Sequence, residues 1–333
     1  MGDPLVSVGM PVYNGERFIR EAIESILAQT FSDFELIVCD NASTDRTEEI
    51  VRAYAARDRR IRYERSDRNR GAAYNYNRVT ALARGKYIRH AAHDDVLGPA
   101  NLARCVAVLE ADPGIALAYP QMSRIDENGH VLDTFSGSLV IDDADPVARW
   151  RAFHRLIAIG SMCDPVFGLF RASVLKATPV LRPLISADMI LLGEIALRGR
   201  IAEIPEVLFF ERWYPGTSVN ANPTLDDRAA WFDPATRSNP LNAMPHWRWL
   251  AAYLDAIARV PLTPVQRMRC AAILLPWCWE YKRGLVLGPG ALIARTLRLR
   301  RLALRIERAL FYGFTPLSSG ERDPAPERTS FVL

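Results

Sequence analysis

The sequence of 333 residues lacks several features that would assign it at once to a class of protein. It has five cysteines, Cys39, Cys105, Cys163, Cys270 and Cys278, and no two of them are spaced as C-x-x-C. An odd and dispersed set of this kind is typical of reduced, buried thiols. We therefore expect a cytoplasmic protein without a structural zinc site.

Long apolar runs are absent as well. The most apolar stretch, residues 271–287, is interrupted by Glu280, Lys282 and Arg283, whereas a membrane-spanning helix needs roughly 18 residues without charge. A strand pattern begins almost at Met1 with no basic and apolar leader before it, so we expect no signal peptide. The net charge of +4 is modest, and without a concentrated basic module we expect no nucleic-acid partner.

The motifs of the commoner α/β enzymes are missing too. The sequence has no P-loop, no G-x-G-x-x-G turn and no G-x-S-x-G elbow. These absences argue against kinases, dehydrogenases and the hydrolases that use a nucleophilic serine.

What the sequence does contain is a regular alternation of strand and helix patterns over residues 5–122. Predicted strands cover 5–10, 34–39, 61–63, 87–92 and 115–119, and predicted helices cover 18–27, 45–54, 71–84 and 102–109. The second helix is expected to open with a capping box formed by Asp45 and Glu48. Such alternation predicts an α/β fold with a doubly wound, mostly parallel sheet flanked by helices, in which ligands bind beyond the carboxyl ends of the strands.

The pattern is less regular after residue 122. Strands are predicted over 166–170, 201–204 and 207–210, and helices over 188–197, 247–258, 264–279 and 289–311. We therefore divide the chain into an α/β domain over residues 1–219, a loop or linker over 220–245, a helical region over 246–316 and a disordered tail over 317–333.

Carboxylates stand where three of the predicted elements begin or end. Asp40 ends the second strand and Asp188 opens a helix, and a capping or turn role is the simplest interpretation of an isolated aspartate. Asp94 and Asp95 are adjacent after the fourth strand, where one carboxylate would be enough for a cap. Because two like charges repel, the pair indicates a positive partner. Mg²⁺ or Mn²⁺ together with a diphosphate is the natural one, since these cations prefer carboxylate and phosphate oxygens.

Several stretches together resemble a known family. The segment VSVGMPVYNGERFIREAIESILAQTFSDFELIVCDNASTDRT is similar to the opening of the family 2 glycosyltransferases. The stretches NRGAAYNYN, AAHDDVLGP, SAD and FFERWYPGTS then follow in the order of that family's motifs. The resemblance implies the GT-A fold and transfer of a sugar, with inversion, from a nucleoside-diphosphate-sugar to an acceptor hydroxyl.

The resemblance also implies roles for individual residues. It implies that Asp94 and Asp95 hold a divalent cation, Mn²⁺ or Mg²⁺, and that Asp188 is the catalytic base. The nucleotide-sugar donor would be bound by Pro11, Tyr13, Asn14, Asp40, Asn69, Gly71, His93, Asp94 and Arg212. Among these, Asp40 would accept a hydrogen bond from the nucleobase, and Arg212 would meet a phosphate with its planar guanidinium. His93 would lie beside the cation and could donate to a sugar hydroxyl.

Three positions depart from the family pattern. Ala92 replaces the first aspartate of the D-x-D metal motif, Asn41 stands where an acidic residue usually follows Asp40, and Tyr214 replaces a late histidine. Each change removes a potential metal ligand.

Other functions compete with this interpretation. Processive polysaccharide synthases carry Q-x-x-R-W, but Phe209 stands at the glutamine position before Arg212 and Trp213. A metal-dependent nucleotidyltransferase would need a glycine-rich, basic signature near the first strand, and this is absent. A catalytically weak nucleotide-sugar-binding protein is compatible with the altered D-x-D motif.

The segment of residues 291–314 is strongly basic and apolar. It carries Arg295, Arg298, Arg300, Arg301, Arg305 and Arg308 against one acid, Glu307. It is either a helix packed on the rest of the protein or a basic amphipathic helix at a membrane surface. The second interpretation predicts a protein that is peripheral on the inner face of the membrane. It would act in bacterial-type cell-surface polysaccharide or glycolipid synthesis, with a lipid-linked saccharide as the acceptor.

Overall fold

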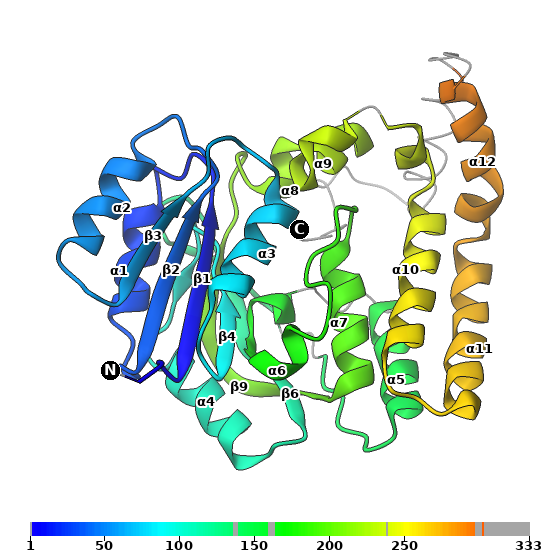
Figure 1. The fold of residues 1–333 in the computed structure, drawn as a ribbon, viewed down its shortest axis with the longest axis horizontal. Helices are drawn as coiled ribbons and strands as arrows, with labels where there is room; N and C mark the ends of the chain where they lie inside the picture. The colour runs from blue at the N-terminus through cyan, green and yellow to red at the C-terminus, as the bar shows by residue number, and fades with distance from the viewer. Residues whose placement is uncertain (1, 136–138, 159–163, 238, 297–301, 303–333) are drawn as a thin grey trace.

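A computed structural model describes residues 2–135, 139–158, 164–237, 239–296 and 302 of the chain. Its centre is a nine-stranded sheet with the order β3-β2-β1-β4-β8-β6-β9-β5, and β7 pairs with β6. Figure 1 shows β3, β2, β1 and β4 next to one another in that order. The strands are β1 Val6–Val12, β2 Phe34–Asp40, β3 Ile61–Arg65, β4 Tyr87–His90, β5 Val96–Leu97, β6 Ile115–Ile125, β7 Val131–Phe135, β8 Leu169–Arg171 and β9 Arg200–Arg212.

The first half of the sheet is parallel, as the alternating pattern predicts. β1 pairs in parallel with both β2 and β4, and β2 pairs in parallel with β3. Every residue of β1 and β2 is buried, which explains why apolar residues dominate both strands. Three helices connect these strands, α1 Ile19–Leu27, α2 Thr47–Ala55 and α3 Ala72–Leu82, whereas α4 Asn101–Ala111 packs on β6, β8 and β9. Because right-handed crossovers reverse face when the strand order reverses after β3, α3 lies on the face opposite α1 and α2.

The second half of the sheet is mixed, which the sequence did not indicate. β8 is antiparallel to β4 and to β6, whereas β9 is parallel to β6. The two predicted strands of residues 201–204 and 207–210 are one strand, β9, whose pairing with β6 shifts register near Pro120. The predicted strand of residues 87–92 ends earlier, at His90, and this leaves the following residues free to form a loop.

The helices of the second half pack together beside the sheet. They are η1 Asp164–Phe167, α5 Pro146–Ala158, α6 Ala172–Leu175, α7 Ala187–Arg198, α8 Ser218–Ala221, α9 Leu225–Phe232, η2 Pro234–Thr236, η3 Pro240–Ala243, α10 Pro245–Arg259, α11 Pro264–Glu280 and α12 Lys282–Thr296. Two buried tryptophans connect these helices. The Trp150 indole of α5 donates to the Cys270 carbonyl of α11 at 3.1 Å, and the Trp249 indole of α10 donates to the Ile185 carbonyl just before α7 at 2.6 Å.

Some sequence predictions need correction here. Residues 220–245 were expected to form a loop or linker, but they contain α9, η2 and η3. The expected capping box at the start of α2 is not formed, because the Asp45 carboxylate accepts from the Thr47 amide and hydroxyl and Glu48 takes no part. The predicted helix of residues 289–311 begins earlier, as α12, and its part beyond residue 296 lies outside the described residues apart from Leu302.

Four of the five cysteines lie within the described residues, and all four are free thiols. Cys39, Cys105 and Cys270 are buried and Cys278 is half-buried. Among the helices of the described ranges, none combines the length and the apolarity that a crossing of the bilayer would require.

Candidate active site

A pocket of about 500 Å³ opens at the carboxyl ends of β1, β2 and β4. One wall comes from the residues that follow these strands, and the opposite wall comes from the end of β9 and from α8, α9 and η2. Figure 1 shows α8 and α9 beside the upper end of α3. The pocket therefore lies where ligands bind in parallel sheets of this kind.

The end of β1 supplies Pro11, Tyr13 and Asn14 to the pocket. β1 pairs with β4 only as far as Gly9, so the missing N–H of Pro11 leaves no gap in that ladder. Asn14 has a positive φ of 54°, and its side chain accepts from the Thr44 amide at 2.8 Å. This fixed turn holds the Tyr13 side chain 44% exposed at the mouth of the pocket.

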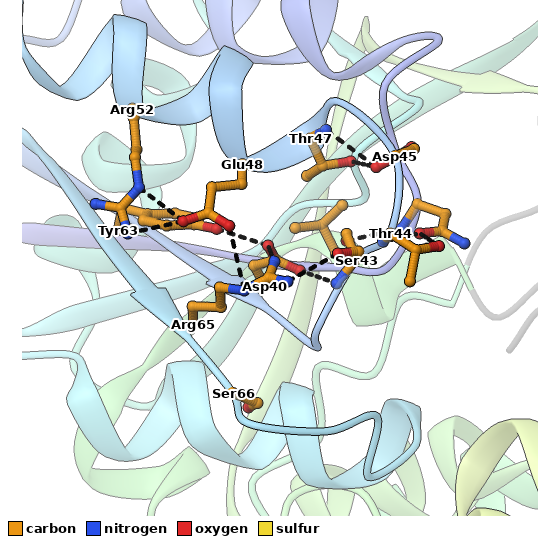
Figure 2. A network of polar contacts seen from close by, with 12 residues as sticks. Asp40, Ser43, Thr44, Asp45, Thr47, Glu48, Arg52, Tyr63, Arg65 and Ser66 are labelled. Carbon is orange, nitrogen blue, oxygen red and sulfur yellow. Dashed lines mark hydrogen bonds and ion pairs between the residues drawn. The ribbon is translucent and has the colours of Figure 1, made fainter.

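Asp40 does not line the pocket, and Figure 2 shows its side chain beside Ser43, Tyr63 and Arg65. Its fully buried carboxylate accepts from the Ser43 amide at 2.7 Å, the Tyr63 hydroxyl at 2.6 Å and the Arg65 guanidinium at 2.5 Å. Burial and the hydrogen bond to Asp40 raise the pKa of Tyr63. These contacts show that Asp40 stabilises the turn of residues 40–43 and links it to β3. Its predicted contact with a nucleobase stays a prediction.

The residue after Asp40, Asn41, does line the pocket, and sequence reasoning did not include it among the site residues. Its amide donates to the Asn69 side chain at 2.9 Å and to the Gly71 carbonyl at 3.2 Å, and its oxygen accepts from the Arg70 amide at 3.0 Å. Asn69 also lines the pocket and accepts from the Gly71 amide at 2.8 Å. The predicted residues Asn69 and Gly71 therefore shape this wall together with Asn41.

Gly71 has a second reason to be glycine. Its φ is +87°, and a Cβ at this position would stand 2.3 Å from the Phe232 carbonyl oxygen at the end of α9. Glycine thus permits α9 to close directly against the start of α3.

Three carboxylates, from Asp94, Asp95 and Glu211, line the deep side of the pocket. The Asp94 carboxylate accepts from the Tyr214 hydroxyl at 3.1 Å, and Asp95 accepts from the Arg212 amide at 2.9 Å. Burial, and then the neighbouring charges of Asp94 and Glu211, raise the pKa of Asp95 well above its ordinary value. Burial also raises the pKa of Glu211, although Glu211 has an ion pair with Arg124 at 2.9 Å.

Glu211 is a second residue that sequence reasoning missed. The signal for it was its place one residue before Arg212, at the end of a strand that runs to the same edge of the sheet as β4. Tyr214, noted in the sequence only as a lost histidine, also faces Asp94. Burial and the nearby carboxylate of Asp94 raise the pKa of Tyr214.

The guanidinium of Arg212 is fully buried and is engaged on several sides. It donates to the Asp94 carbonyl at 2.9 Å, to the Asp126 and Glu127 carbonyls at 3.0 and 3.2 Å, and to the Glu21 carboxylate at 2.6 Å. These bonds join the loop after β4 to α1 and to the turn between β6 and β7. The geometry therefore supports a positioning role for Arg212, and it gives no support to the predicted bidentate phosphate contact.

His93 and Asp188 complete the predicted set. His93 lines the pocket, and its Nδ1 lies 3.9 Å from an oxygen of Asp94. Asp188 is fully buried in the first turn of α7 and is not among the described residues that line the pocket. Burial, and then the charges of Asp94, Asp95 and Asp188, raise the pKa of Tyr76, so these three aspartates all lie near the Tyr76 hydroxyl.

The donor set fits a divalent cation that takes few ligands from the protein. The raised pKa values of Asp95 and Glu211 reflect buried negative charge that a cation would offset. Within the described part of the chain, however, no three His, Cys, Asp or Glu side chains converge as ligands. The remaining coordination would have to come from water and a diphosphate, as is usual for Mg²⁺.

Comparison with known proteins places this site in a family. The model of "Glycosyl transferase family 2" matches residues 7–174. An uncharacterized glycosyltransferase of Methanocaldococcus jannaschii is 39% identical over 137 residues, which are 40% of this chain and 47% of that protein. The putative glycosyltransferase EpsE of Bacillus subtilis is 40% identical over 127 residues, 38% of this chain and 46% of that protein. The chondroitin synthase of Escherichia coli is 35% identical over 129 residues, 39% of this chain and 19% of that protein. The chain thus spans less than half the length of each of these relatives.

Two solved structures share the fold. The structure of S. aureus TarS 1–349 in complex with UDP-GlcNAc has a TM-score of 0.51 at 17% identity and covers 92% of each chain. The mannosyltransferase PcManGT from Pyrobaculum calidifontis, in complex with GDP-Man and Mn²⁺, has a TM-score of 0.50 at 19% identity and covers 95% of this chain and 89% of that one. Both matches confirm the predicted GT-A fold with a helical C-terminal region.

Proposed function

Since the chain belongs to glycosyl transferase family 2, we propose that it transfers a sugar from a nucleoside-diphosphate-sugar to an acceptor hydroxyl with inversion at the anomeric carbon. The observation that carries this proposal is the pocket itself. Its outer wall offers an exposed aromatic ring and amide groups, and its deep wall offers a cluster of buried carboxylates. A nucleoside and a metal-bound diphosphate need these two environments side by side.

The nucleoside is assigned to the outer wall. Tyr13 presents a ring for stacking, with Pro11 and Asn14 beside it. The side-chain amides of Asn41 and Asn69 are fixed by their mutual hydrogen bond, so that the Asn69 NH2 can donate to a base or a ribose and the Asn41 oxygen can accept from one. In this proposal Asn41 therefore takes the nucleobase-binding role that was predicted for Asp40.

The diphosphate is assigned to the deep wall. Mn²⁺ or Mg²⁺ held there by Asp94 and Asp95 would neutralise the charge that develops on the departing diphosphate. Arg237 lines the pocket from the side of η2, is exposed, and has no ion pair with any described carboxylate. With Arg212 engaged elsewhere, Arg237 is the cation that we assign to the phosphates.

The acceptor hydroxyl must lose a proton as it attacks, and we assign that proton to the carboxylate of Asp188. Its position in the first turn of α7, near Tyr76 and the acidic cluster, supports this role. General-base assistance of this kind is typically worth about 10²–10⁴-fold in rate.

We further propose that the acceptor is a saccharide, lipid-linked, of a cell-surface polysaccharide or glycolipid, and that the protein works in the cytoplasm at the inner face of the membrane. The names of relatives, which include a chondroitin synthase, support a polysaccharide product. The basic segment of residues 291–314, on which the membrane prediction first rested, lies largely outside the described residues.

The decisive experiment is a screen of nucleotide sugars by thermal shift with and without Mn²⁺, followed by transfer and hydrolysis assays with each donor that binds. The proposal expects a donor that stabilises the protein, and release of the nucleoside diphosphate. Release of pyrophosphate would instead identify a nucleotidyltransferase, and binding without turnover would identify a nucleotide-sugar-binding protein. Arg237→Ala should weaken donor binding, whereas Arg57→Ala, which removes an exposed arginine outside the pocket, should leave it unchanged.

A further inference from the structure

The outward side of α11 and α12 carries an unusual row of exposed apolar side chains. The two helices follow one another along the edge of the molecule farthest from β1–β3 (Figure 1). Six large residues on this side are between 58% and 73% exposed: Val265, Met268, Leu275, Trp279, Val286 and Ile293. Their spacing of three, four or seven residues places them on one helical face, which we call the outer face.

The outer face is not needed to hold α11 in place. The opposite side of α11 buries Cys270, Leu274 and Trp277, and these pack with α5 and α10. α11 is therefore apolar on two sides, and only one side is covered within the described chain. Large exposed apolar side chains that share one helical face in this way mark a site of interaction.

The charges at the outer face indicate what covers it. The Lys282 ammonium lies 3.6 Å from the centre of the Trp279 ring. Arg269 and Arg283 are also exposed and fall at the edge of the outer face by helical spacing. Glu280 is the one acidic residue in the sequence of α11 and α12. A second copy of the chain would bring this positive edge against its own like, whereas anionic lipid headgroups would complement it.

The position of the outer face relative to the pocket supports the same partner. η3 follows directly after the pocket residue Arg237 and packs against α12. The Trp247 indole at the start of α10 donates to the Leu285 carbonyl of α12 at 2.8 Å. The pocket wall that contains Arg237 is thus connected to α12 through η3 and the start of α10.

We propose that the outer face of α11 and α12 lies in the interfacial layer of an anionic membrane. Trp279 and its apolar neighbours enter the headgroup region, and Arg269, Lys282 and Arg283 meet lipid phosphates. This inference rests on the proposed glycosyl transfer to a lipid-linked acceptor, and it assigns the membrane contact to the outer face of α11 and α12 instead of to the arginines of the basic segment of residues 291–314.

The test is flotation of the full chain with phosphatidylglycerol-containing vesicles and with neutral phosphatidylcholine vesicles. Two variants address the outer face: Met268→Ser/Leu275→Ser/Trp279→Ser, and Lys282→Glu/Arg283→Glu. Val131→Ser/Leu132→Ser, which alters an exposed apolar pair on β7, is the matched control. We expect the wild type and the control to float with anionic vesicles, and each outer-face variant to partition at least about tenfold more weakly.

Three further measurements keep the proposal falsifiable. Thermal shift with a nucleotide sugar should give wild-type donor binding for all variants, which separates a failure of this inference from a failure of the proposed function. A variant with Arg298, Arg300 and Arg301 changed to Gln should still float, and loss of flotation in that variant alone would assign the contact to the later arginines. Sedimentation velocity that shows a dimer abolished by the triple serine variant, with no vesicle binding by the wild type, would overturn the membrane in favour of a second copy.

Discussion

Gly71→Ala tests whether the contact between α9 and the start of α3 forms one wall of the pocket. Gly71 has φ 87° and ψ 167°, a conformation that is almost exclusive to glycine. Strain of this kind typically costs a non-glycine residue about 1–3 kcal/mol. In addition, the new methyl group would stand 2.3 Å from the Phe232 carbonyl oxygen, so the backbone of α9 would have to move.

Gly129→Ala separates these two costs. Gly129 has a similar φ of +84°, but a Cβ there would meet no atom within 4 Å. Both variants should therefore suffer backbone strain, and only Gly71→Ala should also displace α9. We expect the free energy of unfolding in urea to fall by at least about 1 kcal/mol more in Gly71→Ala than in Gly129→Ala.

The displacement should also be visible in function, because α9 and η2 carry Trp231 and Arg237 into the pocket. Donor affinity should fall in Gly71→Ala and should stay unchanged in Gly129→Ala. Isothermal titration with the donor found by thermal shift measures this directly. Equal losses of stability in the two variants, together with unchanged donor affinity in Gly71→Ala, would refute the role given to this contact.

The remaining predictions concern the carboxylates. Asp94→Asn and Asp95→Asn should each abolish most transfer while the melting temperature stays within a few degrees, and EDTA should do the same to the wild type; full activity in excess EDTA would remove the metal from the mechanism. Asp188→Asn should lower turnover by at least about 10²-fold with donor affinity retained, whereas a loss of affinity with turnover kept would make Asp188 a binding residue. Burial of the Glu35 carboxyl raises its pKa, but hydrogen bonds from Arg84, Ser7 and Arg62 outweigh burial and hold the pKa below the ordinary 4.5. The stability that Glu35 contributes is therefore present above the unfolded-state pKa and is lost as pH falls through the folded-state pKa. Urea denaturation between pH 6 and pH 3 should show this decline in the wild type and a smaller one in Glu35→Gln, and identical slopes would contradict it.

The parallel half of the fold could be predicted from the sequence because its determinants are local. β1 and β2 are short apolar runs that end at polar residues, and the helices between them show a clear apolar periodicity. The adjacent pair Asp94 and Asp95 was also a local signal, and the structure places both side chains in the pocket.

The contacts of Arg212 could not be predicted, since they join segments that are far apart in the chain. Glu21, Asp94 and Asp126 come from α1, from the loop after β4 and from the turn after β6, and no spacing in the sequence links them. The prediction placed Asp40 in the pocket, whereas the pocket is lined by Asn41, and this error has a different cause. Successive side chains near a strand end point to different sides, and a one-residue error reverses which of two neighbours faces the ligand.

The helix α9 could have been found from the sequence. Thr224 accepts from the Asp227 amide at 3.1 Å as the N-cap of this helix, and T-x-x-D is a recognisable start signal. The abundance of Asn, Pro and Asp around it favoured a loop, because η2 and η3 also use such residues as caps.

The pocket walls come from two stretches of chain, and the family model matches only the first of them. The nucleotide-side wall lies within residues 7–174, which match the family model, whereas α8, α9 and η2 follow after that match ends. The two walls meet where the Phe232 carbonyl lies over Gly71. A chimaera that exchanged residues 216–237 for the corresponding segment of another family member would therefore keep Tyr13, Asn41 and Asp94 in the pocket and would replace Trp231 and Arg237, provided that a glycine remained at position 71. Position 71 therefore limits which replacement segments the pocket can accept, because any side chain there would meet the backbone at the end of α9.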